Sequence, residues 1–173
     1  MTTPRWLNDI EMRAWRGLMT TDRLLFEQLG RELNRESGLS MADYEVMVRL
    51  SEADGRRLRM SDLAAAALSS KSRLSHQITR MEEAGWVRRE SCPSDRRGAF
   101  AVLTHAGYAA LVDAAPGHVE SVRRNLFDHL TEEQVRQLAE ITGVLRARLE
   151  EAVERDYAAP RRGGAVEVES GAY

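Results

Sequence analysis

The stretch from residue 70 to residue 84 carries basic, amide and hydroxyl side chains at helical spacing. Arg73, His76, Gln77 and Arg80 fall on one stripe of a helix, flanked by hydroxyl groups. Arginine donates two hydrogen bonds to guanine, glutamine can do the same for adenine, and hydroxyl groups bind bases or phosphates. A second stripe of the same helix is apolar and predicts the buried side: Leu74, Ile78 and Met81. This pattern is typical of a helix that reads base edges in DNA.

A merely hydrophilic surface helix is the alternative, and the acidic residues argue against it. Only Glu82 and Glu83, near the far end, are acidic. Residues 56–98 hold ten basic and five acidic residues, a local charge of +5, whereas the whole chain is -2 and the remainder is therefore -7. Such segregation of charge indicates a polyanionic partner for this segment, since a solvated surface would scatter the signs.

A second group of arginines lies in "CPSDRRG", between the β-leaning runs "WVRRES" and "AFAVL". Proline, serine, aspartate and glycine favour a turn, so the segment predicts a hairpin with arginines at its tip. A narrow minor groove attracts inserted arginine, and a hairpin tip is thin enough to enter it. The alternative is a solvent-exposed turn with a local ion pair.

Helices surround this region. The first predicted helix is long and ends at Gly38. Its apolar stripe consists of Leu7, Ile10, Ala14, Leu18, Leu25, Leu29 and Leu33. Ser40 predicts the N-cap of a second helix, with Gly55 after its end. Ser61 is the predicted N-cap of a short helix, "SDLAAAAL". The DNA-reading helix is predicted to start at Ser69 or Ser70 and to end at Gly85. The last two helices fit a helix-turn-helix.

After the hairpin the helical period returns. Thr104 starts a long helical region with a break or kink at Pro116–Gly117. Thr131 and Gln134 form a capping box, followed by a final stripe at Val135, Leu138, Ile141, Leu145, Leu149 and Val153. The tail is rich in small and polar residues and predicts mobility, although "AVEVE" alternates and could add a strand. The fold class expected is mainly α with a small β-hairpin wing.

Composition excludes several classes of protein. The length of 173 residues suits one domain, or one domain with an extension, and 43% hydrophobic with 30% charged residues is ordinary for a globular protein. No apolar run approaches the roughly 18 residues that a membrane helix needs, and the N-terminus lacks a signal-peptide core. Cys92 is the only cysteine, so an internal disulfide is excluded and a cytoplasmic location is expected. No HExxH, CxxC, glycine-rich phosphate loop or nucleophile elbow occurs, so we expect no enzyme, metal site or cofactor.

The region "MSDLAAAALSSKSRLSHQITRMEEAGWVRRESCPSDRRGAFAVLTHAGYAAL" resembles the winged helix-turn-helix of MarR-type (multiple antibiotic resistance regulator) transcription factors. The most specific pieces are "RMEEAGWVRR", the wing "SDRRGAFAVLT" and the following "THAG". The family's wing has Asp, any residue and Arg before a strand and a Leu-Thr step, which Asp95, Arg97, Leu103 and Thr104 match. The resemblance spans about residues 6 to 155.

The resemblance implies which residues meet double-stranded DNA. In the wing, Arg97 would enter the minor groove, Asp95 would buttress it and Arg96 would contact the backbone. The recognition-helix contacts would be Ser70, Lys71, Ser72, Arg73, Ser75, His76, Gln77 and Arg80.

The resemblance also implies a homodimer that reads a near-palindromic operator with half-sites about one helical turn apart. The implied interface residues are Trp6, Leu7, Ile10, Leu18, Leu126, Phe127, Leu130, Leu138, Ile141 and Leu145. We therefore expect a dimerisation helix at 6–38, the winged helix-turn-helix at 39–104, C-terminal dimerisation helices at 105–155 and a tail at 156–173. The commonest arrangement in the family is repression that a small molecule relieves.

Many members bind phenolic or lipophilic acids between the reading head and the dimerisation region. Trp15, Met19, Tyr44 and Met47 are candidates for such a cleft and are equally typical of core packing. Peroxide-sensing members use a cysteine in the first helix, which has none here. The other functions considered are a winged-helix module that binds protein and an architectural DNA binder without sequence preference.

Overall fold

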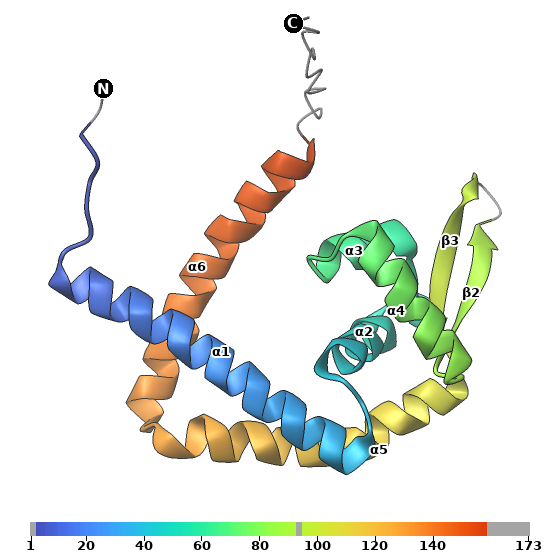
Figure 1. Ribbon diagram of the computed structural model, residues 1–173, viewed down its shortest axis with the longest axis horizontal. Helices are drawn as coiled ribbons and strands as arrows, with labels where there is room; N and C mark the ends of the chain where they lie inside the picture. Colours follow the sequence, from blue (N-terminus) through green and yellow to red (C-terminus); the bar gives the residue numbers. More distant parts are fainter. Residues whose placement is uncertain (1–2, 93–94, 159–173) are drawn as a thin grey trace, which may run out of the picture. The chain divides into compact units, whose positions relative to one another are not determined.

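A computed structural model of the chain describes residues 3–92 and 95–158, which are mainly helical with one small sheet (Figure 1). The elements are α1 (Asp9–Ser37), α2 (Met41–Glu52), η1 (Asp54–Arg56), β1 (Arg57–Arg59), α3 (Met60–Ala66), α4 (Lys71–Glu83), β2 (Val87–Cys92), β3 (Asp95–Leu103), α5 (His105–Asn125), η2 (Phe127–His129) and α6 (Glu132–Ala158). The described residues form two compact units that divide after His129. The predicted fold class, helices around a β-hairpin wing, is confirmed.

Most of the predicted helix ends are confirmed by their capping bonds. Ser40 and Ser70 are N-caps, and each hydroxyl accepts the backbone N–H three residues further on. Gly38 ends α1 in the left-handed conformation, with φ of 72°. In the second unit, Thr131 and Gln134 exchange side-chain to backbone bonds of 2.9 and 3.2 Å, which is the predicted capping box.

Two helices begin elsewhere than predicted. Helix α1 begins at Asp9 because Asn8 and Glu11 form a capping box, so Leu7 lies before the helix. Ser61 is not an N-cap, since α3 begins one residue earlier, at Met60. The reason is that the preceding residues form strand β1, which extends the chain up to the first helical residue.

The sheet has three antiparallel strands in the order β1–β3–β2. The predicted hairpin is β2 and β3, with Val87 opposite Leu103 and a register shift between Ser91 and Cys92. Strand β1 was not predicted, because a run of three residues is too short to show alternation. Strand β3 of the hairpin is therefore paired along both edges, with β1 on one side and β2 on the other.

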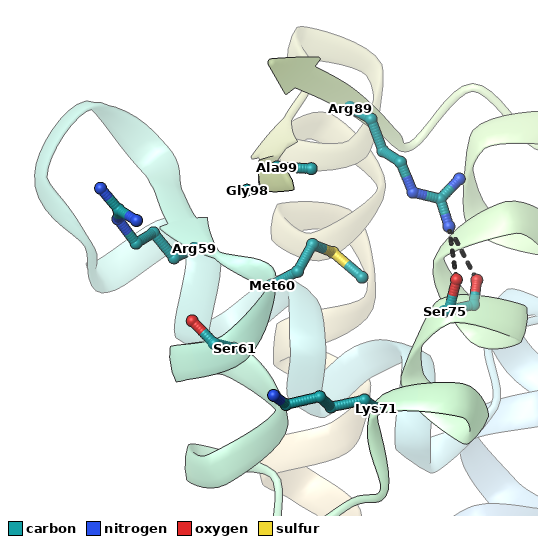
Figure 2. Close-up of a pocket in the computed structure, with 8 residues that line it drawn as sticks. All are labelled: Arg59, Met60, Ser61, Lys71, Ser75, Arg89, Gly98 and Ala99. Carbon is teal, nitrogen blue, oxygen red and sulfur yellow. Dashed lines mark hydrogen bonds between the residues drawn. The ribbon is translucent and has the colours of Figure 1, made fainter. Parts of the chain in front are cut away.

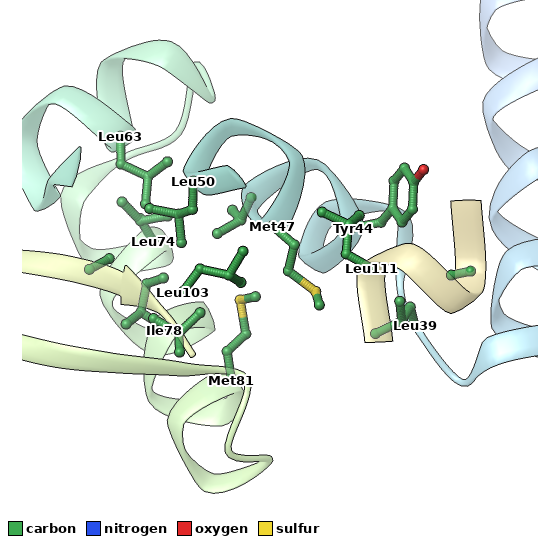
Figure 3. Close-up of a cluster of buried hydrophobic side chains, with 14 of the residues drawn as sticks. Leu39, Tyr44, Met47, Leu50, Leu63, Leu74, Ile78, Met81, Leu103 and Leu111 are labelled. Carbon is green, nitrogen blue, oxygen red and sulfur yellow. The ribbon is translucent and has the colours of Figure 1, made fainter. Parts of the chain in front are cut away.

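The core of the first unit lies between α2, α3, α4, α5 and β3 (Figure 3). The predicted buried stripe of α4 is confirmed, since Leu74, Ile78 and Met81 are almost fully inaccessible. Figure 3 shows these side chains directed toward Met47 and Leu50 of α2. Helix α4 is therefore anchored by its inner face, which leaves its outer face available.

Helix α5 is continuous through Pro116, so of the break or kink predicted there the break is wrong. Contacts on the far side of the proline hold the helix against its neighbours. The His118 ring lies 4.6 Å from the Tyr44 ring of α2, and Ser121 donates a hydrogen bond to the buried Glu32 of α1. Tertiary packing therefore outweighs the lost backbone hydrogen bond.

The long apolar stripes of α1 and α6 are mostly not covered within one chain. In α1 only Leu29 and Leu33 of the predicted stripe are buried. Of the residues expected at a dimer interface, Trp6, Leu7, Ile10, Leu18, Ile141 and Leu145 are exposed, while Leu126, Phe127, Leu130 and Leu138 are partly buried. Exposed apolar stripes of this length are typical of surfaces that meet another chain.

The C-terminal helix extends further than predicted, since residues 156–158 are helical. The rest of the expected tail, residues 159–173 with the "AVEVE" run, lies outside the described residues. Over residues 3–92 and 95–158, none of the helices combines the length and the hydrophobicity that crossing a membrane requires.

Candidate nucleic-acid interface

Helix α4 presents a polar outer face opposite its buried stripe. Seven of the eight residues predicted to meet DNA on this helix or at its cap are exposed: Ser70, Lys71, Ser72, Arg73, Ser75, His76 and Arg80. The exception is Gln77, which is half-buried. The outer face can therefore donate hydrogen bonds from guanidinium, ammonium and hydroxyl groups to bases and phosphates.

Gln77 faces helix α2 and not the outer surface of α4. Its side-chain Nε2 donates to Oδ1 of Asp43, 3.0 Å away, and the nearest guanidinium nitrogen of Arg80 is 3.6 Å from the same oxygen. The base-reading role predicted for Gln77 therefore conflicts with its position. The contact between Asp43 and Gln77 spans 34 residues, so the pattern within α4 did not indicate it.

Arg89 of strand β2 connects the wing to the opposite flank of α4. Its guanidinium pairs with the Glu82 carboxylate and donates to the Ser75 carbonyl oxygen at 2.8 Å and to the Thr79 hydroxyl at 3.1 Å. The backbone N–H of Arg89 also donates to Glu82, at 2.7 Å. Sequence reasoning missed this role, although the separation of seven residues between Glu82 and Arg89 across a turn was visible in the sequence.

The base of the wing is held by the start of α5. Thr104 is the predicted N-cap, and its hydroxyl accepts the Gly107 N–H at 2.9 Å and donates toward the carbonyl oxygens of Gly85 and Trp86. A Cβ atom at Gly107 would collide with the Trp86 carbonyl group, so glycine is required there. This contact explains the "THAG" sequence in physical terms.

The tip of the wing carries the remaining predicted DNA contacts. Asp95, Arg96 and Arg97 begin strand β3, and Asp95 lies opposite Cys92. The side chains of these three residues lie outside the described part of the structure. Cys92 ends strand β2 and is buried.

A basic cavity of about 400 Å³ lies beside the outer face of α4 (Figure 2). Its charged lining residues are Arg59, Lys71 and Arg89, and the hydroxyl groups of Ser61 and Ser75 also line it. Strand pairing places Arg59 opposite Phe100, whose ring centroid is 5.5 Å from the guanidinium carbon. Sequence reasoning did not include Arg59 or Ser61 in the interface, because strand β1 was not predicted.

A second cavity, of about 330 Å³, is lined by charges that compensate each other. Glu90 pairs with Arg88 and lies 3.9 Å from Arg57. The first cavity is therefore the more suitable one for an anion.

Neither of the two cavities described above is lined by any of the four candidate ligand residues. Met47 has no exposed surface and lies in the core, and Tyr44 is also buried there. Trp15 and Met19 lie on α1, where 52% and 43% of their surfaces are exposed.

The buried Tyr44 contacts the imidazole of the half-buried His118. Burial raises the pKa of the Tyr44 hydroxyl and lowers the pKa of His118, so it favours the neutral form of both groups. The Nδ1 atom of His118 is buried and has no hydrogen-bond partner among the described residues. Within residues 3–92 and 95–158, no three His, Cys, Asp or Glu side chains are arranged to hold a metal ion.

Comparisons with known proteins identify the family. The model described as MarR family matches residues 39–98. The transcriptional regulator HosA of Escherichia coli O111:H- is 36% identical over 95 residues, which cover 54% of this chain and 69% of HosA. The crystal structure of AbsC, a MarR family regulator from Streptomyces coelicolor, has 51% identity and a TM-score of 0.78, covering 86% of this chain and 99% of AbsC. Sco3205 from the same organism, solved in complex with DNA, has 46% identity and a TM-score of 0.78, covering 84% of this chain and 91% of Sco3205. The chain belongs to the MarR family and is a transcriptional regulator, not an enzyme.

Proposed function

We propose that this regulator acts in the cytoplasm as a homodimer that represses transcription by occupying a near-palindromic operator. Helix α4 enters the major groove and the β2–β3 wing the minor groove. The observation that carries the proposal is the surface of α4, where Arg73, His76 and Arg80 are exposed and where Lys71 and Ser75 line the basic cavity together with Arg59. The complex of the relative Sco3205 with DNA supports this assignment.

Two of the carboxylates near this face, Asp43 and Glu82, already have partners within the protein. Asp43 is bonded by Gln77 and lies near Arg80, and Glu82 is paired with Arg89. The helix can therefore approach phosphates with most of its positive charge available. In the wing, Arg97 is proposed as the minor-groove residue, with Asp95 and Arg96 in supporting roles.

Dimerisation is proposed through the stripes at residues 6–38 and 105–155, with 39–104 as the reading head. The exposure of Trp6, Ile10, Ile141 and Leu145 supports this division, because a second copy would cover apolar surface that one chain leaves in water. Two-fold symmetry then places two α4 helices on half-sites about one helical turn apart.

A phenolic or lipophilic acid is the proposed inducer. The unpartnered Nδ1 atom of His118 supports it, since in the tautomer that carries its proton on Nε2 this atom is an acceptor that a phenolic hydroxyl would satisfy. Trp15, Met19 and Tyr44 are the proposed apolar contacts. Met47 is reachable only after the core opens, because it is completely buried.

The test is selection of binding sites from random duplexes, followed by binding across a salt series. We expect a palindromic consensus and a steep loss of affinity as salt increases. Steep salt dependence without a consensus would indicate an architectural DNA binder. Absence of binding at low salt would favour a module that binds protein.

A further inference from the structure

Asp43 of α2 is a buried carboxylate directed at the recognition helix. It is 6% exposed, so it cannot itself reach a base. Three partners surround it: the Ser40 hydroxyl donates to Oδ2 at 2.7 Å, Gln77 donates to Oδ1 at 3.0 Å, and a guanidinium nitrogen of Arg80 lies 3.6 Å from Oδ1. A buried carboxylate is retained only with such compensation. Asp43 therefore holds Ser40 and Gln77 through hydrogen bonds and attracts the Arg80 guanidinium as an ion pair.

The two partners on α4 share one flank of that helix. Residues three apart on an α-helix are about 60° apart around its axis, so Gln77 and Arg80 point in related directions. The opposite flank, at Ser75 and Thr79, is held by Arg89 of the wing. Helix α4 is therefore held by Asp43 on one flank and by Arg89 on the other. Among the side chains proposed to meet DNA, Arg89 contacts Ser75. Asp43 contacts Gln77 and Arg80.

The contact restricts the groups that α4 presents. The Arg80 side chain is 65% exposed, yet its guanidinium leans toward Asp43. A planar guanidinium held by a carboxylate presents its remaining donors in one direction, which is the geometry that two-bond recognition of guanine requires. A released arginine can turn to any nearby phosphate, which adds affinity without sequence preference.

We propose that Asp43 is a specificity-determining positioning residue, which sets the direction in which Arg80 meets the bases while never touching DNA. This inference rests on the proposed binding of DNA by α4. Removal of the Asp43 charge should change sequence discrimination and affinity for unrelated DNA in different ways. Discrimination between sequences decreases, whereas affinity for unrelated DNA stays the same or increases, because a negative charge near phosphates is lost.

The experiment compares D43N with wild-type protein, using the selected operator, variants of it at each base pair and an unrelated duplex. We expect D43N to lose about tenfold in discrimination at the base pairs where R80A also loses it, in the range of one two-bond base contact. In the R80A background, D43N should have no further effect on those base pairs. Binding of D43N to the unrelated duplex should not weaken.

Glu45→Gln is the matched control. Glu45 lies on the same helix, is exposed and pairs with Arg49 at 2.8 Å, so this variant removes an equal charge outside the contact. The proposal is overturned if E45Q and D43N change discrimination equally, if D43N weakens all duplexes equally, or if the effects of D43N and R80A multiply. If D43N does not fold, Ser40→Gly removes the bond to Oδ2 and should give a smaller loss at the same base pairs; an unchanged profile overturns the proposal.

The failure of this inference differs from failure of the proposed function. Wild-type protein that selects a consensus, together with a D43N variant of identical profile, refutes only the role of Asp43. Wild-type protein that selects no consensus refutes both.

Discussion

The carboxylate of Glu32 on α1 lies 2.8 Å from a guanidinium nitrogen of Arg124 on α5, although 92 residues separate them in sequence. The same oxygen accepts hydrogen bonds from Ser121 and Asn125, and the other oxygen accepts one from Gln28. Glu32 is therefore the central polar contact between these two helices. Its hydrogen bonds, with that of Ser121 the most important, lower its pKa from 4.5 to about 2 against the opposing effect of burial.

The first prediction concerns the stability of the α1–α5 packing. Replacing Glu32 with alanine removes these bonds and leaves the Ser121 hydroxyl without its acceptor, so the free energy of unfolding should decrease by about 1–3 kcal/mol. Denaturant unfolding measures it. The control is Glu27→Ala, since Glu27 makes only an exposed pair with Arg31 and its loss should change stability by under about 1 kcal/mol. Equal effects of the two variants would contradict the prediction.

The second prediction concerns pH. The pKa of Glu32 is lower in the folded protein, about 2, than the value of 4.5 that an ordinary glutamate has when unfolded. Its stabilising contribution is therefore fully present above pH 4.5 and is lost as the pH falls toward 2. Stability curves of wild-type protein and Glu32→Gln should differ by a constant amount above this window and converge within it. Parallel curves down to pH 2 would show that Glu32 is not the group responsible.

The third prediction concerns the connection between wing and recognition helix. Arg89→Ala removes the bonds to Glu82, Ser75 and Thr79, so both stability and affinity for the operator should decrease, the affinity by about tenfold if one charged contact of 1–2 kcal/mol is lost. The neighbouring Arg88→Ala is the matched control, since Arg88 pairs with Glu90. Fluorescence anisotropy with labelled operator distinguishes them, and unchanged affinity of the Arg89 variant would show that α4 keeps its position without this residue.

The fourth prediction concerns the wing tip. Arg97→Ala should weaken operator binding strongly and reduce the salt slope of log affinity by about 1, because one arginine no longer displaces counterions from DNA. Titrations at several salt concentrations give both quantities. A variant with wild-type affinity and slope would exclude Arg97 from the minor groove.

The fifth prediction concerns oligomeric state. A charge at the exposed Ile141 of α6, introduced as Ile141→Asp, should convert a dimer into monomers, because burying an unpaired carboxylate opposes association. Sedimentation at micromolar concentration measures it, and Gln137→Asp, at an exposed polar position of α6, is the control. Wild-type protein that sediments as a monomer and still binds a palindrome tightly would refute the dimer itself.

The sequence predicted those features of the fold that depend on residues close together in the chain. The buried stripe of Leu74, Ile78 and Met81 follows from helical period, and the caps at Ser40 and Ser70 depend on bonds within three residues. The hairpin was predicted for the same reason, because turn residues and β-leaning runs are neighbours in the chain.

What the sequence did not predict depends on contacts between distant residues. Asp43 meets Gln77 across 34 residues, so the half-buried position of Gln77 follows from the packing of α2 against α4 and not from the pattern within α4. Strand β1 exists because Arg59 pairs with Phe100. The continuity of α5 through Pro116 likewise depends on its contacts with α1 and α2.

Helix α4 is anchored from the core and from its wing-side flank, so the residues that position the helix differ from those that it exposes to solvent. Leu74 and Arg89 hold the helix, whereas the side chains of Ser72, Arg73 and His76 are exposed, and within the described residues they form no hydrogen bond or ion pair with another helix or strand. Ser72 contacts only the hydroxyl of the N-cap Ser70. Substitutions at these three outward positions should therefore leave the folded scaffold intact. Under the proposed reading of DNA by α4, a new set of target genes can be acquired by exchanging a few surface side chains, so this architecture is suited to divergence after gene duplication.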